Sequence, residues 1–119
     1  MTGEITPKDG NEYLSTVLKL YLDLPETPSR ASPNDRKSAA ELHARGISLA
    51  TVESAFLLAS VRRLTRSPDA SPLSPIRSLA YFFPVIEEAL GNPIPESYLE
   101  YLRSKVASLS RSRILIKCG

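Results

Sequence analysis

The sequence predicts an all-α protein, a single compact bundle of four to six helices joined at proline-rich corners. Three observations favour this fold class. Apolar residues recur at the three- and four-residue spacing of amphipathic helices, no segment sustains the alternation of a β-strand, and no hairpin turn lies between β-rich segments. At 119 residues, the chain has the size of one ordinary domain and can bury one core.

The first expected helix covers residues 11–24. Its apolar residues form two neighbouring stripes, which together make a surface wide enough to contact more than one helix. Pro25 ends the pattern and opens a loop at 25–33 that contains three prolines. We expect the segment before this helix, residues 1–10, to be a flexible N-terminus.

The second expected helix is marked at both ends. Ser32 is a favourable N-cap, and Asp35 follows three residues later, where a capping box places its acidic side chain. Gly46 lies just past the other end, where a left-handed residue closes many helices. Ser48 then caps a third helix that reaches about Arg66 and, as the most apolar of the set, is expected to be central.

The fourth expected helix begins at Pro75, after a second proline-rich loop, and has a proline in its middle. Its inward spacing of 76, 79, 83, 86 and 90 continues through Pro84, although a proline inside a helix costs about 3 kcal/mol. Burial of two or three large apolar side chains offsets that cost. We therefore expect a bend or break at residues 82–84, with Phe83 in the core beside the third helix.

The fifth expected helix follows Pro95 and completes a helical domain at residues 11–110, and a basic C-terminal tail occupies 111–119. The one cysteine, Cys118, has no partner for an internal disulfide, which favours a reducing, cytoplasmic location. No stretch is long and apolar enough to predict a membrane span.

Residues suited to catalysis or metal binding are sparse. His43 is the only histidine, and together with one terminal cysteine it cannot build a zinc site of the usual composition. Glu87 and Glu88 are adjacent, so on a helix they point about 100° apart and do not face each other as an acid–base pair. The five glycines are scattered and form no phosphate-binding loop. We therefore expect no enzyme, no cofactor and no metal.

Residues 33–66 resemble a helix-turn-helix pair. Gly46 occupies the place of the turn glycine, Ile47 that of the apolar plug, and Val52 that of a core contact on the second helix. Arg45 departs from the pattern, because an apolar residue is usual directly before the glycine. An ordinary two-helix corner explains the same residues, and the sequence leaves both interpretations open.

Basic residues are concentrated in the second half of the chain. Residues 1–59 have six basic and eight acidic residues, whereas residues 60–119 have nine and five, and no acidic residue follows Tyr101. This asymmetry favours a surface that contacts phosphates, although a solvated helix end followed by a tail explains it too. The candidate nucleic-acid-binding residues are Arg62, Arg63, Arg66, Arg103, Arg111 and Arg113, with Ser48, Ala50, Thr51 and Ser54 at the start of the third helix.

Two segments resemble small helical accessory proteins and C-terminal helical modules of replication initiators from plasmids and other mobile elements. The first runs from Leu42 to Ile47 and leads into Val52 and Glu53, and the second spans residues 75–83 and leads into 86–88. The catalytic and nucleotide-binding domains of initiators are not in this sequence. The resemblance implies an accessory unit that binds DNA or docks on a protein.

The sequence leaves two functions open. The first is a non-catalytic, accessory nucleic-acid-binding protein of a mobile element or its replication machinery. The second is a helical protein–protein interaction module, homodimeric or with another partner, that has no nucleic-acid role. The apolar surface of residues 11–24 favours the second function, because a domain of this size cannot cover every stripe.

Overall fold

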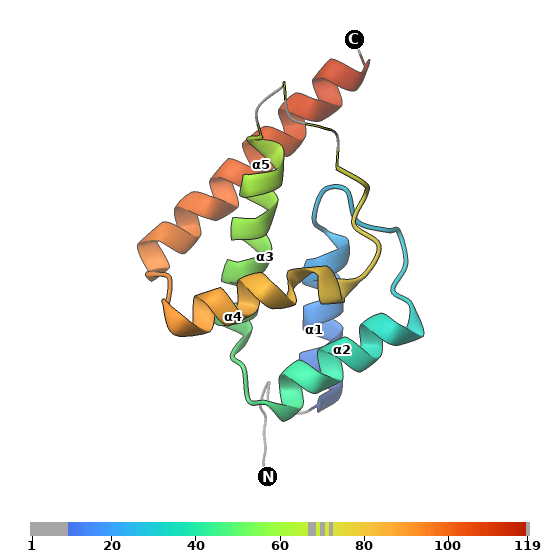
Figure 1. The fold of residues 1–119 in the computed structure, drawn as a ribbon, viewed down its shortest axis with the longest axis vertical. Coiled ribbons are helices and arrows are strands. Elements are labelled where there is room, and N and C mark those ends of the chain that lie inside the picture. Colours follow the sequence, from blue (N-terminus) through green and yellow to red (C-terminus); the bar gives the residue numbers. More distant parts are fainter. Residues whose placement is uncertain (1–9, 67–68, 70, 72, 119) are drawn as a thin grey trace.

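The computed structural model describes residues 10–66, 69, 71 and 73–118, with side chains as far as Leu109. In this part of the chain the secondary structure is helical throughout and includes no strand (Figure 1), which confirms the predicted all-α fold. The elements are α1 (Gly10–Leu22), α2 (Pro33–Ala44), α3 (Leu49–Leu64), the 3₁₀ helix η2 (Leu79–Phe82), α4 (Phe83–Gly91) and α5 (Glu96–Cys118). The expected flexible N-terminus lies outside the described residues, apart from Gly10.

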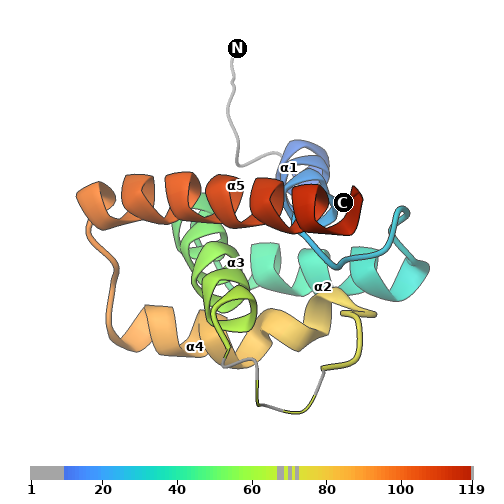
Figure 2. The same cartoon turned by 90° about the horizontal axis from the view of Figure 1, so that it is seen from above.

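Helix α3 is the centre of the fold, as its apolar composition predicts. It packs mainly against α4 and α5, and also against α1 and η2. Figure 2 shows α3 between α5 and α4, with α1 and α2 beside it. Helix α2 packs instead on α1 and η2. The predicted caps of the two helices are present, because Ser32 and Ser48 each accept a backbone hydrogen bond and Gly46 has a φ of 71°.

Three aromatic rings join α1, α3 and η2 in the core. Tyr21, Phe56 and Phe82 are completely buried. The ring centroids of Phe56 and Phe82 are 4.8 Å apart, and Tyr21 lies 6.5 Å from Phe56 and 6.1 Å from Phe82. The rings are tilted or edge-on to one another, an arrangement in which their quadrupoles attract.

A buried carboxylate connects the start of α2 to η2. The Oδ2 atom of Asp35 accepts the Ser32 backbone N–H at 2.9 Å, and the Ser32 hydroxyl accepts the Asp35 N–H at 3.1 Å. These two bonds form the predicted capping box. The Oδ1 atom of Asp35 accepts the backbone N–H of Leu79 at 2.9 Å. Asp35 therefore fixes where η2 begins, although 44 residues separate it from Leu79 in the sequence.

The segment predicted as the fourth helix begins later than expected and breaks as expected. Residues 75–78 are not helical, so Ser74 and Pro75 do not start a helix. The break between η2 and α4 falls at Phe82–Phe83, which confirms the interruption predicted near Pro84. Pro84 lies in the first turn of α4, where a backbone N–H has no partner within the helix and its loss is harmless.

The prediction that Phe83 lies in the core is confirmed only in part, because Phe83 packs against the core without being enclosed by it. Phe82 is completely buried against α3, whereas Phe83 is only partly buried. A 3₁₀ helix has three residues per turn, so Phe82 lies one turn after Leu79 on the same, inward side. The inward series then continues through Ile86 and Ala89, which leaves Leu90 41% exposed.

Helix α5 packs on α3 through its first half. Leu99, Leu102 and Val106 are buried, as their spacing predicts. The backbone helix continues to Cys118, so it includes residues 111–118 of the expected tail, and its last turns extend past the end of α3 (Figure 1). None of the described helices combines the length and the apolar character that crossing a bilayer requires.

Replacing Tyr21 with Phe is expected to stabilise the protein. The Tyr21 hydroxyl is buried and has no hydrogen-bond partner among the described residues, so its removal relieves an uncompensated polar group and raises the free energy of unfolding by about 1 kcal/mol. Burial, with a smaller effect of Asp35, raises the Tyr21 pKa to about 12. Unfolded Tyr ionises near its ordinary pKa of about 10, so the wild type should lose stability above this pH, and the Phe variant should lose less. Urea unfolding at neutral and alkaline pH measures both effects.

Tyr13→Phe is the matched control. The Tyr13 hydroxyl donates to the carbonyl of Ile47 at 2.6 Å in a buried contact. Its removal leaves that carbonyl without this donor and is expected to lower the free energy of unfolding by about 1–2 kcal/mol. Equal destabilisation by both Phe variants would contradict the assignment of the two hydroxyls.

Replacing Asp35 with Ala is expected to destabilise the protein by about 3 kcal/mol, because it removes the capping box and leaves the Leu79 N–H without this acceptor. Ser32→Ala removes only the cap and is expected to cost about 1 kcal/mol. Thermal and urea unfolding of both variants give the comparison. If the two substitutions cost the same, the Asp35–Leu79 bond contributes nothing to stability.

Candidate nucleic-acid interface

Three of the predicted phosphate-binding arginines are bound to glutamates of the same chain. Arg62 forms two hydrogen bonds with Glu88, at 2.9 and 2.6 Å. Arg103 forms two with Glu53, at 2.8 and 2.9 Å. The third, Arg63, binds a glutamate in the loop after α1. A phosphate that approaches any of these guanidinium groups must therefore replace a charge-assisted pair.

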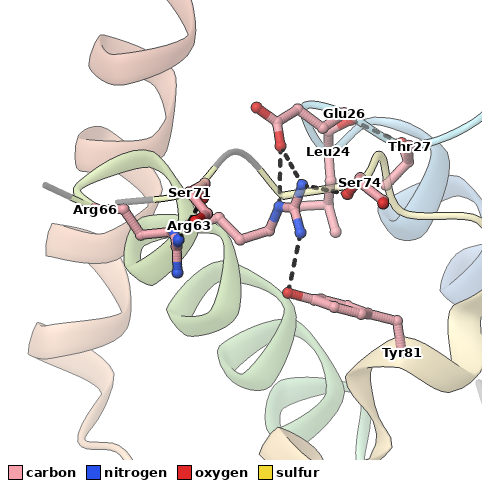
Figure 3. A network of polar contacts seen from close by, with 8 residues as sticks. All are labelled: Leu24, Glu26, Thr27, Arg63, Arg66, Ser71, Ser74 and Tyr81. Carbon is pink, nitrogen blue, oxygen red and sulfur yellow. Dashed lines mark hydrogen bonds and ion pairs between the residues drawn. The ribbon is translucent and has the colours of Figure 1, made fainter. Parts of the chain in front are cut away.

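Arg63 is the most buried of these arginines, with 7% of its side chain exposed. Its Nε and Nη2 atoms donate to one carboxylate oxygen of Glu26, at 2.9 and 2.6 Å. The same guanidinium donates to the carbonyl of Ser74 at 2.9 Å and to the hydroxyl of Tyr81 at 3.2 Å (Figure 3). Arg63 thus connects α3 to two loops and to η2, and is better suited to holding the fold than to binding a ligand.

Glu26 adopts a backbone conformation that is unusual for a residue other than glycine. Its φ is 68°, in the left-handed region. Two contacts hold it there: the carboxylate binds Arg63, and the backbone carbonyl accepts the N–H of Ile76 at 3.0 Å. The loop after α1 and the loop before η2 are therefore joined side by side, with Arg63 beneath them.

The remaining predicted arginines do not complete a single patch. Arg66 is exposed and donates to the carbonyl of Ser71 at 2.6 Å (Figure 3). Arg103 pairs with Glu53, which lies nine residues before Arg62 on α3, a distance of about 14 Å along the helix axis. The side chains of Arg111 and Arg113 lie outside the described residues.

The hydroxyl groups at the start of α3 bind the helix itself. The Ser48 hydroxyl accepts the Thr51 N–H at 3.1 Å and donates to the Thr51 hydroxyl at 3.0 Å. Ser54 is buried, and its hydroxyl donates to the Ala50 carbonyl at 2.8 Å. Ala50, Thr51 and Ser54 line a hollow of about 270 Å³ whose opposite wall is the connection between α4 and α5, including Ile94. Ser48 and Ala50 are exposed, whereas Ser54 is buried, so only part of this helix start is open to a ligand.

The turn between α2 and α3 is tied to α4. Arg45, which departs from the helix-turn-helix pattern, donates to both oxygens of Glu87, at 2.6 and 3.2 Å. Glu88, the next residue, binds Arg62 instead, so the adjacent carboxylates point to different partners as their helical spacing predicts. The pair of helices is thus built as a corner whose two members pack mainly on other elements.

Two tyrosines of α5 form the main aromatic feature of the described surface, and neither is among the binding residues predicted from the sequence. Tyr98 and Tyr101 are 44% and 50% exposed. Their rings are stacked, with centroids 5.5 Å apart and an interplanar angle of 20°. Their three-residue spacing in the sequence indicates that they share one side of the helix. Leu99 and Leu102 already form the buried face, so the tyrosines are expected outside it.

A groove of about 430 Å³ opens beside Tyr98. Leu58 and Arg62 of α3 form one part of its lining, and Glu88 of α4 and Pro95 before α5 form another. The groove is thus apolar in part and crossed by one ion pair. Among the described residues, no group of three or more His, Cys, Asp or Glu side chains is placed to hold a metal ion.

Compared with protein-family models, with curated proteins and with solved structures, the chain matches none of them. The resemblance of residues 42–53 and 75–88 to replication-initiator modules therefore stays a prediction.

Replacing Glu88 with Gln is expected to lower the urea midpoint at neutral pH and to have a smaller effect in acid. The hydrogen bond from Arg62 lowers the pKa of Glu88. A carboxyl group with a lowered folded-state pKa stabilises the protein above its ordinary pKa, and this contribution is lost as pH falls through the folded value. The difference between wild type and variant should be present at about pH 7 and should shrink as pH falls below the ordinary carboxyl pKa of about 4.3.

Glu100→Gln is the matched control, because Glu100 is an exposed acid that forms no salt bridge with the described residues. This variant should unfold nearly like the wild type at neutral and acidic pH, because the attraction between Glu100 and Arg103 is exposed and screened by solvent. A pH-independent effect of Glu88→Gln would contradict the ion-pair assignment.

Proposed function

We propose that the protein is a non-catalytic nucleic-acid-binding module and that α5, rather than the α2–α3 pair, makes the contact. One observation carries this proposal: the helix that exposes Tyr98 and Tyr101 continues into a segment with no acidic residue after Glu100 and with five basic residues, of which Arg103 pairs with Glu53. Aromatic rings that stack on bases, combined with cations that track phosphates, are typical of nucleic-acid-binding surfaces. The last turns of α5 extend away from the helical body, which gives an extended ligand access (Figure 1).

The ion pairs favour α5 over the predicted arginine patch. Arg62, Arg63 and Arg103 already bind carboxylates, so their charges contribute little net potential to an approaching phosphate. Lys105 lies on α5 and forms no ion pair within the described part of the chain. The resemblance to initiator modules supports an accessory role beside a replication protein.

Fluorescence anisotropy with labelled single-stranded and duplex DNA tests this function. Binding should weaken as salt rises, because each neutralised phosphate releases counterions. Replacing Lys105 with Gln should reduce the slope of log affinity against log salt by about 0.7 to 0.9. Lys37→Gln on α2 is the control, because it removes the same charge elsewhere. The absence of any anisotropy change at micromolar protein and low salt would contradict the proposal.

A second function is favoured by the groove beside Tyr98. Its lining by aliphatic residues, prolines and a tyrosine is suited to a protein partner, because the buried centres of protein interfaces are enriched in aromatic residues. In this alternative the chain is a helical interaction module, and a second copy is the simplest partner. Sedimentation velocity over a concentration series tests self-association, and a constant monomer mass would contradict it.

A further inference from the structure

The stacked tyrosines of α5 are not needed to fill the core. Leu99, Leu102 and Val106 occupy the side of the helix that faces α3. Tyr98 and Tyr101 lie on the flank of that side and remain about half exposed. The pair is therefore an aromatic surface that remains about half exposed and can contact a ligand.

The geometry of the pair suits a planar ring. An interplanar angle of 20° and a centroid distance of 5.5 Å place the two tyrosines nearly parallel, so that a third ring can extend the stack. Bases of a duplex are stacked on each other and are not available to such a surface, whereas bases of a single strand are. The geometry therefore selects an unpaired base.

Cations flank the stack on both sides. Lys105 follows Tyr101 by four residues and so lies on the same side of α5. Arg62 lines the groove beside Tyr98, where the Glu88 carboxylate binds it and Pro95 supplies an apolar wall. Glu100 points about 100° away from Tyr101 around the helix. A nucleic-acid backbone that passes the tyrosines thus meets the ammonium group of Lys105, which has no ion pair among the described residues, and the guanidinium group of Arg62, which also binds Glu88.

We propose that the protein binds single-stranded nucleic acid by stacking an unpaired base on the Tyr98–Tyr101 pair, with the adjacent phosphate beside Lys105. This inference rests on the proposed nucleic-acid function and specifies its ligand and its site. Most of the selectivity comes from the stack, because one free lysine cannot distinguish a single strand from a duplex. The stack tolerates different bases, since every base offers an aromatic face.

Anisotropy of the full chain with three probes tests the site: labelled oligo-dT of about 15 nucleotides, an abasic strand of equal length, and a duplex. The wild type should bind oligo-dT more tightly than the abasic strand and the duplex. The Tyr98→Ala/Tyr101→Ala double variant should lose about fivefold to 150-fold in affinity for oligo-dT and little for the abasic strand. The Tyr98→Phe/Tyr101→Phe double variant keeps the rings and should bind oligo-dT like the wild type.

Intrinsic fluorescence gives a second readout. The chain contains five tyrosines and no tryptophan, so a base stacked on Tyr98 or Tyr101 should quench the tyrosine emission of the wild type. The Ala double variant should lose this quenching. Circular dichroism should show both double variants folded like the wild type, and thermal unfolding should show at most a small loss for the Ala variant, because the substituted rings are about half exposed.

The outcomes separate the two proposals. If the wild type binds all three probes equally and the Ala variant is unchanged, the stacking site is wrong and the nucleic-acid function stands. If the wild type binds no probe at low salt, both proposals fall. If the Ala variant dissociates a dimer in sedimentation velocity and leaves oligo-dT binding intact, the tyrosines form a protein contact and the stacking site is overturned.

Discussion

The contact between Phe82 and Phe56 is the interaction on which the rest of the structure depends. Phe82 reaches Phe56 only because η2 is a 3₁₀ turn, and η2 begins where Asp35 accepts the backbone N–H of Leu79. Pro84 then requires a new helix start, since its ring cannot continue the preceding turn. A buried carboxylate on α2 and a proline on α4 together fix the rotation of α4 about its axis.

The rotation of α4 decides which arginines are free. With Phe82, Ile86 and Ala89 inward, Glu87 and Glu88 diverge to opposite flanks of the helix. Glu87 meets Arg45 at the α2–α3 turn, and Glu88 meets Arg62 near the end of α3. The packing of the core therefore pairs Arg62, which the charge distribution predicted to bind phosphate, with a glutamate. This pairing makes α5 the better candidate interface.

Local features of the sequence predicted local features of the structure well. The Ser32 cap with Asp35, the left-handed Gly46 and the Ser48 cap each depend on residues a few positions apart, and all three are present. The burial of Phe82 was not predicted, because a 3₁₀ turn changes the spacing of inward residues and no residue type in this segment is characteristic of such a turn. The ion pairs were missed because their partners are 26 to 50 residues apart, and helical periodicity carries no information about distant pairs.

The tyrosines of α5 are exposed because other residues of the helix form its buried side. A helix that crosses one neighbour buries a narrow stripe, and leucine and valine at positions 99, 102 and 106 fill that stripe. Tyrosines at its flank add little to the core, yet they are held in a fixed orientation by the helix beneath them and by their own stacking. Stacking of the two rings on each other reduces the conformational entropy that they lose when a planar ligand binds. With four of the described arginines already paired with glutamates, this aromatic stack, rather than net charge, is the feature of the surface best suited to recognition.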